Sequence, residues 1–126
     1  MATIERFEEL EVWKAGMELC AEVYKTTNTE LFAKDFGLKD QIRRASVSVP
    51  SNISEGYERD SKKQFLYFLV IAKGSCGEVR TQLKIAQMLG YINEDNYEII
   101  NNKALTTIKQ LAGFIKYLKQ YQPNKD

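Results

Sequence analysis

The chain has 126 residues, 44% of them hydrophobic and 28% charged, with a formal net charge of +1. This size and composition predict a single globular domain over residues 1–126 with a substantial core. The sequence contains no histidine, which excludes Ser–His and Cys–His nucleophiles, histidine bases and the Glu-x-x-His pairs of di-iron bundles. We expect no cofactor and no metal site.

The sequence also bears on the compartment. The longest apolar run, at 65–72, has eight residues, whereas a membrane span needs about 20. The opening MATIERFEELEVW lacks the basic and apolar regions of a signal peptide. Cys20 and Cys76 are isolated in the sequence and fit free thiols in a reducing compartment. We therefore expect a cytoplasmic protein with no membrane segment.

Two neighbouring apolar stripes predict a first helix over about 4–27, with Thr3 as its N-cap. A connection of about eight residues, 28–35, follows it. The first stripe has heptad spacing and contains Leu10, Trp13, Met17, Cys20 and Tyr24, and the second contains Val12, Gly16, Leu19 and Val23.

The next segment, about 36–58, fits two patterns. Residues 45–49 alternate like a strand and run into Pro50. A strand would need a partner, however, and only the apolar run at 65–71 is available, inside a longer helical pattern. We therefore predict a helix that Pro50 bends by removing the bond to the carbonyl of Ser46. Its apolar stripe is Ile42, Ala45, Val49, Ile53 and Gly56.

Two more helices are predicted over about 61–89 and 94–121. Ser61 and Gln64 form a capping box, Gly90 fits the position after the helix end, and Asn93 fits an N-cap. Short connections between four amphipathic helices predict an all-α, antiparallel up-down-up-down four-helix bundle. The tail, 122–126, should fray.

The turn near residue 60 should fold the third helix back onto the second. Residues equally distant from the turn should then be neighbours, with Ser48 beside Ala72 and Ala45 beside Ser75. Arg44 should lie near Glu78. Small residues on both helices predict a close helix pair.

A polar stripe runs along the edge of the second predicted helix. We favour a hydrogen-bonded network that fixes helix register or joins subunits, because its charged groups can neutralise one another. The alternative is a ligand or catalytic site, although no nucleophile–base pair is evident. The stripe contains Gln41, Arg44, Ser48, Asn52, Glu55 and Arg59, with Glu78 expected beside it.

Charge is spread unevenly along the chain. Residues 1–38 hold four basic and eight acidic groups, whereas residues 39–90 hold nine basic and five acidic groups. Basic groups in the middle of the chain either hold phosphates or form a solvated face. Lys62 and Lys63 oppose the dipole of the helix they begin, which is a mild sign of a separate task. The candidate nucleic-acid-binding residues are Arg43, Arg59, Lys62, Lys63, Arg80 and Lys84.

Several of these motifs together resemble the four helix bundle protein family, also called 23S rRNA-intervening sequence proteins, over about 7–121. They are Phe7-Glu8-Glu9-Leu10-Glu11-Val12-Trp13, Gln41-Ile42-Arg43-Arg44-Ala45, Ser48, Asn52-Ile53-Ser54-Glu55-Gly56-Tyr57, Phe65, Phe68, Ala72, Gly74-Ser75 and Glu78. The resemblance implies a compact four-helix subunit and assembly into a five-fold ring or barrel, and it supplies no catalytic residue that could be carried over to this chain. In a related branch, the accessory protein of diversity-generating retroelements, a strongly basic surface binds nucleic acid. The balanced charge of this chain differs from that branch.

Three functional hypotheses follow. The leading one is a non-enzymatic binding or scaffold protein with no small-molecule substrate. It should form a homo-oligomer, with a pentamer favoured, because the first, third and fourth predicted helices carry apolar stripes wider than one bundle core requires. The second is an RNA-binding protein that associates with ribosomal RNA or a ribonucleoprotein through the basic groups. The third is a hydrolase built on carboxylates such as Glu55 and Glu78.

Overall fold

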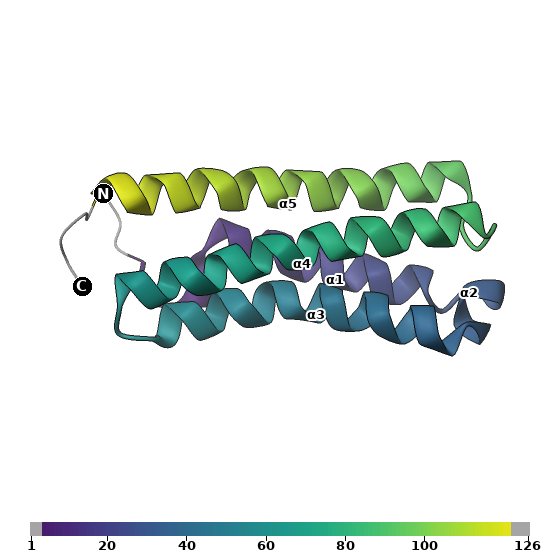
Figure 1. Ribbon diagram of the computed structural model, residues 1–126, viewed down its shortest axis with the longest axis horizontal. Coiled ribbons are helices and arrows are strands. Elements are labelled where there is room, and N and C mark those ends of the chain that lie inside the picture. The colour runs from purple at the N-terminus through teal and green to yellow at the C-terminus, as the bar shows by residue number, and fades with distance from the viewer. Residues whose placement is uncertain (1–3, 122–126) are drawn as a thin grey trace.

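The computed structural model describes residues 4–121, and in this range it contains helices and turns but no strand. The four long helices are α1 (Glu11–Thr26), α3 (Phe36–Glu58), α4 (Lys62–Met88) and α5 (Glu94–Tyr121). A short 3-10 helix, η1 (Phe7–Glu9), precedes α1, and a short helix, α2 (Glu30–Lys34), precedes α3. The prediction of an all-α helical bundle is confirmed (Figure 1). The predicted cap at Thr3 and the predicted fraying of 122–126 lie outside the described residues.

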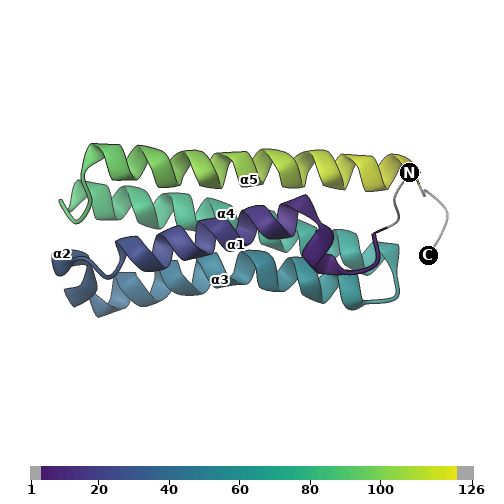
Figure 2. The same ribbon diagram turned by 180° about the vertical axis from the view of Figure 1, so that it is seen from behind.

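Successive long helices run in alternating directions along the bundle (Figures 1 and 2). α3 packs against both α1 and α4, and α5 packs against both α4 and α1. α1 and α4 therefore occupy diagonal corners of the bundle. Each of these two helices turns one side away from the rest of the subunit, and these two sides face opposite directions.

Of the two apolar stripes on α1, the second faces the core. Val12, Leu19 and Val23 are buried, whereas Met17 and Tyr24 of the heptad stripe are exposed. A β-carbon on Gly16 would lie 3.0 Å from Val49 Cγ1 and 3.4 Å from Pro50 Cδ. The absent side chain therefore lets α1 pack closely onto α3.

The predicted start of the first helix, near residue 4, is wrong. α1 begins at Glu11, because Leu10 adopts an extended conformation with φ −73° and ψ 130°. The preceding segment instead turns back over the end of the bundle. Its Phe7 ring lies 5.5 Å from the Trp13 ring and 6.5 Å from the Tyr57 ring. Aromatic packing therefore competes with continuation of the helix.

The predicted 28–35 connection contains a helix that the sequence analysis missed. α2 buries Phe32 completely, and the Phe32 ring lies 5.5 Å from the Tyr91 ring. Asp35 then caps α3 by accepting a hydrogen bond from the Leu38 amide at 3.0 Å. Tyr91 donates to the other oxygen of this carboxylate at 2.9 Å, which ties the start of α3 to the turn between α4 and α5.

The predicted caps at Ser61, Gly90 and Asn93 are confirmed, although only the Ser61 half of the predicted capping box forms, because Gln64 Oε1 accepts from Arg59 instead. Ser61 Oγ accepts from the Gln64 amide at 3.1 Å, and Asn93 Oδ1 accepts from the Asn96 amide at 2.8 Å. Gly90 has φ 79°, the left-handed conformation that favours glycine after a helix. α3 continues through Pro50, so the helical interpretation of residues 45–49 is correct.

Candidate interaction surfaces

The polar stripe of α3 forms two separate groups of contacts. In the first, Ser48 Oγ lies 2.9 Å from Ser75 Oγ of α4. Asn52 Nδ2 donates to both the carbonyl and the hydroxyl oxygen of Ser48, each at 2.8 Å. Because Ser75 is buried, this group satisfies polar atoms inside the α3–α4 contact.

The predicted register between α3 and α4 is about one turn off. Ser48 meets Ser75, whereas the turn symmetry placed it beside Ala72. Side chains lean toward the N-terminus of their own helix, so on both helices the residue that reaches a given spot lies about one position further along the chain. A β-carbon on Gly56 would lie 2.7 Å from Phe68 Cβ, which confirms a close helix pair, although here a glycine faces an aromatic ring.

The second group lies near the end of α3. Arg59 Nη2 and Nε contact Glu55 Oε2 at 2.6 Å and 2.9 Å. Arg59 Nη1 also donates to Gln64 Oε1 at 3.1 Å, and the guanidinium lies over the Phe68 ring at 5.0 Å. Both charged side chains are about half exposed, so this ion pair contributes little to stability.

Three members of the predicted stripe belong to neither group of contacts: Gln41, Arg44 and Glu78. All three are exposed, and within residues 4–121 none of them has a hydrogen-bond or ion-pair partner. Within one subunit, Arg44 and Glu78 therefore do not join a neutralising network, and the alternative that the stripe joins subunits stays a prediction. Their side chains point to solvent, which removes the low-dielectric setting such a network needs.

The structure gives no support to the two carboxylates as a hydrolytic pair. Glu55 on α3 forms an ion pair with Arg59, whereas Glu78 is exposed on α4. The hollow of about 260 Å³ beside Glu55 is lined by Phe7, Ser54, Glu55, Glu58 and Arg59.

Among the candidate nucleic-acid-binding residues, Arg43 has a structural role that the sequence did not reveal. Its Nε donates to Thr27 Oγ1 at 2.8 Å, and its Nη2 donates to Asn28 Oδ1 at 3.0 Å and to the Tyr24 carbonyl at 3.4 Å. The guanidinium also lies over the Tyr24 ring at 4.4 Å. Arg43 therefore caps the C-terminal end of α1, where a cation is favourable.

Three other candidates contact neighbouring groups on α4 and α5. Lys62 Nζ donates to the Leu118 carbonyl in the last turn of α5 at 3.3 Å. Arg80 Nε donates to Asn101 Oδ1 at 3.0 Å. Lys84 Nζ donates to Gln87 Oε1 at 2.8 Å and lies 5.0 Å from the centre of the Tyr97 ring.

Lys62 therefore has a structural role at the start of α4, because its side chain caps the end of α5. Of the six candidates, Lys63 is exposed and makes no hydrogen bond or ion pair within the described range. Arg43 contacts the residues that follow α1, whereas α4 begins at Lys62, and the start of α4 lies at the other end of the bundle from the end of α1 (Figure 1). The structure does not gather the six into one patch.

The outer side of α4 is an apolar surface that the sequence analysis did not single out. Tyr67 is 63% exposed, Val70 54% and Met88 76%. Gly74 and Gly77 lie between them, and a β-carbon on either would meet no atom within 4 Å. The helical spacing of these residues opposite the core stripe was the available signal. We call this surface the α4 outer stripe: Tyr67, Val70, Gly74, Gly77, Thr81, Ile85 and Met88.

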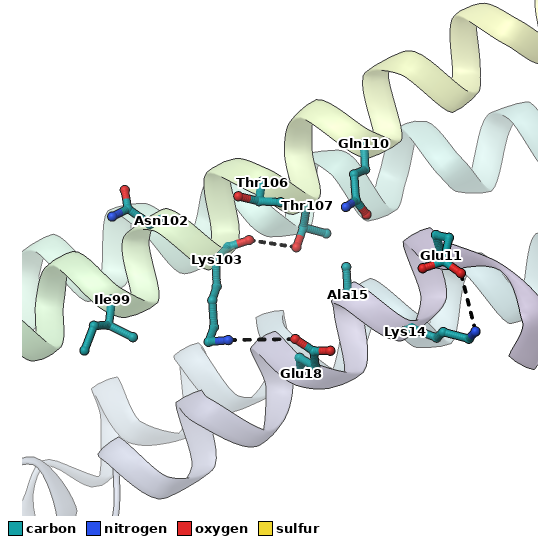
Figure 3. A pocket seen from close by; sticks show the side chains of 10 residues that line it. All are labelled: Glu11, Lys14, Ala15, Glu18, Ile99, Asn102, Lys103, Thr106, Thr107 and Gln110. Atoms are coloured by element: carbon teal, nitrogen blue, oxygen red, sulfur yellow. Dashed lines mark hydrogen bonds and ion pairs between the residues drawn. The ribbon is translucent and has the colours of Figure 1, made fainter.

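A groove of about 470 Å³ lies along the contact between α1 and α5 (Figure 3). On the α1 side, Glu11 pairs with Lys14 at 3.4 Å, and Glu18 pairs across the groove with Lys103 at 3.8 Å. The full lining is Glu11, Lys14, Ala15, Glu18, Ile99, Asn102, Lys103, Thr106, Thr107 and Gln110.

A second, more apolar hollow of about 570 Å³ adjoins this groove, because both are lined by Glu11 and Gln110. Its other lining residues are Ile4, Glu9, Leu10, Val12, Gly113 and Phe114. We call the two together the α1–α5 groove.

The two thiols lie in different surroundings. Cys76 is buried, and this burial raises the pKa of its thiol to about 12. Cys20 is half-buried and accepts a hydrogen bond from Ser46 Oγ at 3.6 Å. Both cysteines are free. The described part of the chain has no cluster of three or more potential metal ligands, and no helix in it is long and apolar enough to span a membrane.

Comparison with known proteins gives a family match and similar solved structures. The family model described as "23S rRNA-intervening sequence protein" matches residues 8–113. The chain is also similar to a crystal structure of a protein of unknown function from the S23 ribosomal protein family of Bacteroides thetaiotaomicron, with a TM-score of 0.77 and 30% sequence identity. That match covers 83% of this chain and 98% of the other. No curated protein matches the chain.

Proposed function

This chain belongs to the 23S rRNA-intervening sequence protein family, and we propose that it is a non-enzymatic, oligomeric binding or scaffold protein. Neither the family description nor that of the structural neighbour names an enzymatic activity. The carboxylates, hydroxyls and thiols described above are occupied in ion pairs and helix contacts or lie exposed and apart. The surface of the subunit therefore carries the function.

The observation that carries this proposal is the α4 outer stripe. A glycine in the middle of a helix costs about 0.5–1 kcal/mol relative to alanine. Gly16 and Gly56 have a compensating reason, because other helices of the same subunit approach them closely. Gly74 and Gly77 meet nothing within 4 Å, and large apolar side chains lie exposed on either side of them. A second chain packed on this stripe would explain both features.

We favour a pentamer, the assembly that the family resemblance implies. The test is the molar mass by light scattering at micromolar concentration. We expect about five times the chain mass of 14.5 kDa. The chain mass itself would contradict the proposal.

Weak RNA binding is the second candidate function. The observation in its favour is the charge of α4, which carries five basic residues and one acidic residue. Several of these cations are already engaged in contacts within the subunit, so each subunit would neutralise few phosphates, and a ring would repeat them.

Fluorescence anisotropy with structured and single-stranded RNA tests this candidate. We expect affinity to fall about 10- to 100-fold between ~50 and ~200 mM salt, as for a few phosphate contacts. Lys63→Glu should weaken binding, whereas Lys34→Glu on α2 is the control. No binding at ~50 mM salt would remove RNA binding and leave protein scaffolding.

We place the protein in the cytoplasm, where its two free cysteines stay reduced.

A further inference from the structure

Two helices on diagonal corners of the subunit carry opposite charge. α1 itself has three acidic and two basic residues, and the preceding residues 4–10 add three acidic residues and one basic residue, so the segment 4–26 has a net charge of −3. α4 has five basic residues and one acidic residue, a net charge of +4. α3 and α5 lie between these corners, so the acidic residues of 4–26 and the basic residues of α4 do not lie side by side within one subunit. Each group of charges can therefore attract a neighbouring copy of the chain.

The same charges disfavour a contact between two copies of α4. Lys73, Arg80 and Lys84 follow one another at seven and four residues, so they line one side of the α4 outer stripe. In an antiparallel contact between two copies of α4, the two-fold axis would set this basic side against its own counterpart. Like charges placed opposite each other oppose association. The partner of the stripe is therefore expected to be a different, acidic surface.

The α1–α5 groove has a complementary shape and a small acidic excess, because its charged lining residues are Glu9, Glu11 and Glu18 against Lys14 and Lys103. It is concave, whereas the α4 outer stripe is the convex side of a helix. Glu11 and Glu18 stand on its α1 side (Figure 3). Their present partners, Lys14 and Lys103, form exposed pairs at 3.4 Å and 3.8 Å. Such surface pairs are weak, so lysines of an incoming α4 can compete with them.

The lining of the groove also includes a glycine that nothing inside the subunit explains. Gly113 lies in the middle of α5 and lines the apolar part of the groove. A β-carbon there would meet no atom within 4 Å. The groove and the α4 outer stripe thus share one feature, a mid-helix glycine that no contact inside the subunit requires. Each permits another backbone to approach closely.

From these observations we propose that copies of this chain associate head to tail, with the α4 outer stripe of one subunit packed in the α1–α5 groove of the next. This inference rests on the proposed oligomer and adds its contact surfaces. The contact joins two different surfaces, so a pair of subunits still has a free α4 outer stripe on one subunit and a free α1–α5 groove on the other. Repetition with a closing rotation makes a ring.

Two blocked variants test the pairing. The stripe variant is Val70→Glu with Ile85→Glu, at positions exposed in the subunit. The groove variant is Glu11→Lys with Glu18→Lys, also exposed. We expect each to be a monomer by light scattering, with association at least about 100-fold weaker, because like charges then face each other. Circular dichroism should show unchanged helix content.

Matched controls lie on α2. Leu31→Glu is compared with the stripe variant, because Leu31 is 56% exposed and Val70 is 54% exposed. Glu30→Lys is compared with the groove variant. Both controls should assemble like the wild type.

The decisive measurement is an equal mixture of the two blocked variants. One keeps a working groove and the other a working stripe, so one contact remains and a heterodimer of twice the 14.5 kDa chain mass should form. A mixture that stays monomeric, or a groove variant that assembles like the wild type, would overturn the head-to-tail pairing while leaving oligomerisation intact. A monomeric wild type would instead remove the proposed oligomer itself.

Discussion

α3 and α4 pack against each other, yet their unusual residues have different explanations. On α3, the features that disturb a regular helix are accounted for within the subunit. Gly56 makes room for Phe68, and Pro50 sits at the α1 contact near Gly16. On α4, Gly74 and Gly77 lie in open space, beside exposed Tyr67. The same residue type therefore marks an internal contact on one helix and an unfilled external one on the other.

This difference distinguishes two structural reasons for a glycine in the same bundle. Glycines at internal crossings are needed to fold a single chain, because a side chain there would collide with a neighbour. Glycines on the outer side of α4 weaken the isolated helix and give the single chain nothing in return. Substitutions at the two kinds of site should therefore change stability in opposite directions.

Gly56→Ala should have the largest effect. The added methyl group would lie 2.7 Å from Phe68 Cβ and 3.1 Å from Phe65 Cδ1, which is overpacking at the closest approach of α3 and α4. We expect a loss of unfolding free energy in the upper part of about 1–3 kcal/mol. Urea unfolding measures it. Equal or greater stability would show that α3 and α4 do not pack this closely.

Arg43→Ala should follow in size. It removes the hydrogen bonds to Thr27 and Asn28 that cap α1, and charge-assisted bonds of this kind contribute about 1.5–3 kcal/mol at most. Partial exposure should reduce the loss to about 1–2 kcal/mol. The readout is the melting temperature, with Lys34→Ala on α2 as the control. Lower RNA affinity without lower stability would return Arg43 to the nucleic-acid surface.

The sequence predicted what depends on local pattern. Helix periodicity and caps at Ser61, Asn93 and Gly90 depend on residues within one or two turns of each other, so the chain order reveals them. The role of Arg43 was hidden because Thr27 and Asn28 lie 15 or 16 residues away. α2 was hidden because a five-residue helix is too short to show a period.

The candidate site was harder to predict for a related reason. A polar stripe on a helical wheel shows which residues share a side, but it does not show whether that side is covered. The structure covers Ser48 and leaves Arg44 and Glu78 in solvent, so one predicted network became two groups and three isolated residues. For α4 the sequence predicted more apolar surface than one core requires, but it did not identify the residues of the α4 outer stripe, since an apolar stripe is usually assigned to the core.

Gly74→Ala is the matched counterpart of Gly56→Ala. A β-carbon at Gly74 meets nothing within 4 Å, so alanine should stabilise the isolated subunit by about 0.5–1 kcal/mol through helix propensity. If another chain approaches here, the same change should weaken assembly. Urea unfolding of a monomeric background variant measures the first effect, and light scattering of the wild-type background measures the second. Unchanged assembly would indicate that no backbone approaches Gly74.

Arg44→Ala should have the smallest effect on folding, because Arg44 belongs to α3 without sharing its internal contacts. Its side chain is exposed and has no hydrogen-bond or ion-pair partner in residues 4–121, so the unfolding free energy should change by less than about 0.5 kcal/mol. A loss of about 3–5 kcal/mol would instead indicate a buried partner. Arg44 lines a hollow of about 620 Å³ together with Tyr24, Ser51 and Asn52. If the variant folds normally but loses assembly or RNA binding, this hollow is part of an external contact, and α3 then has an outward-facing role as α4 does.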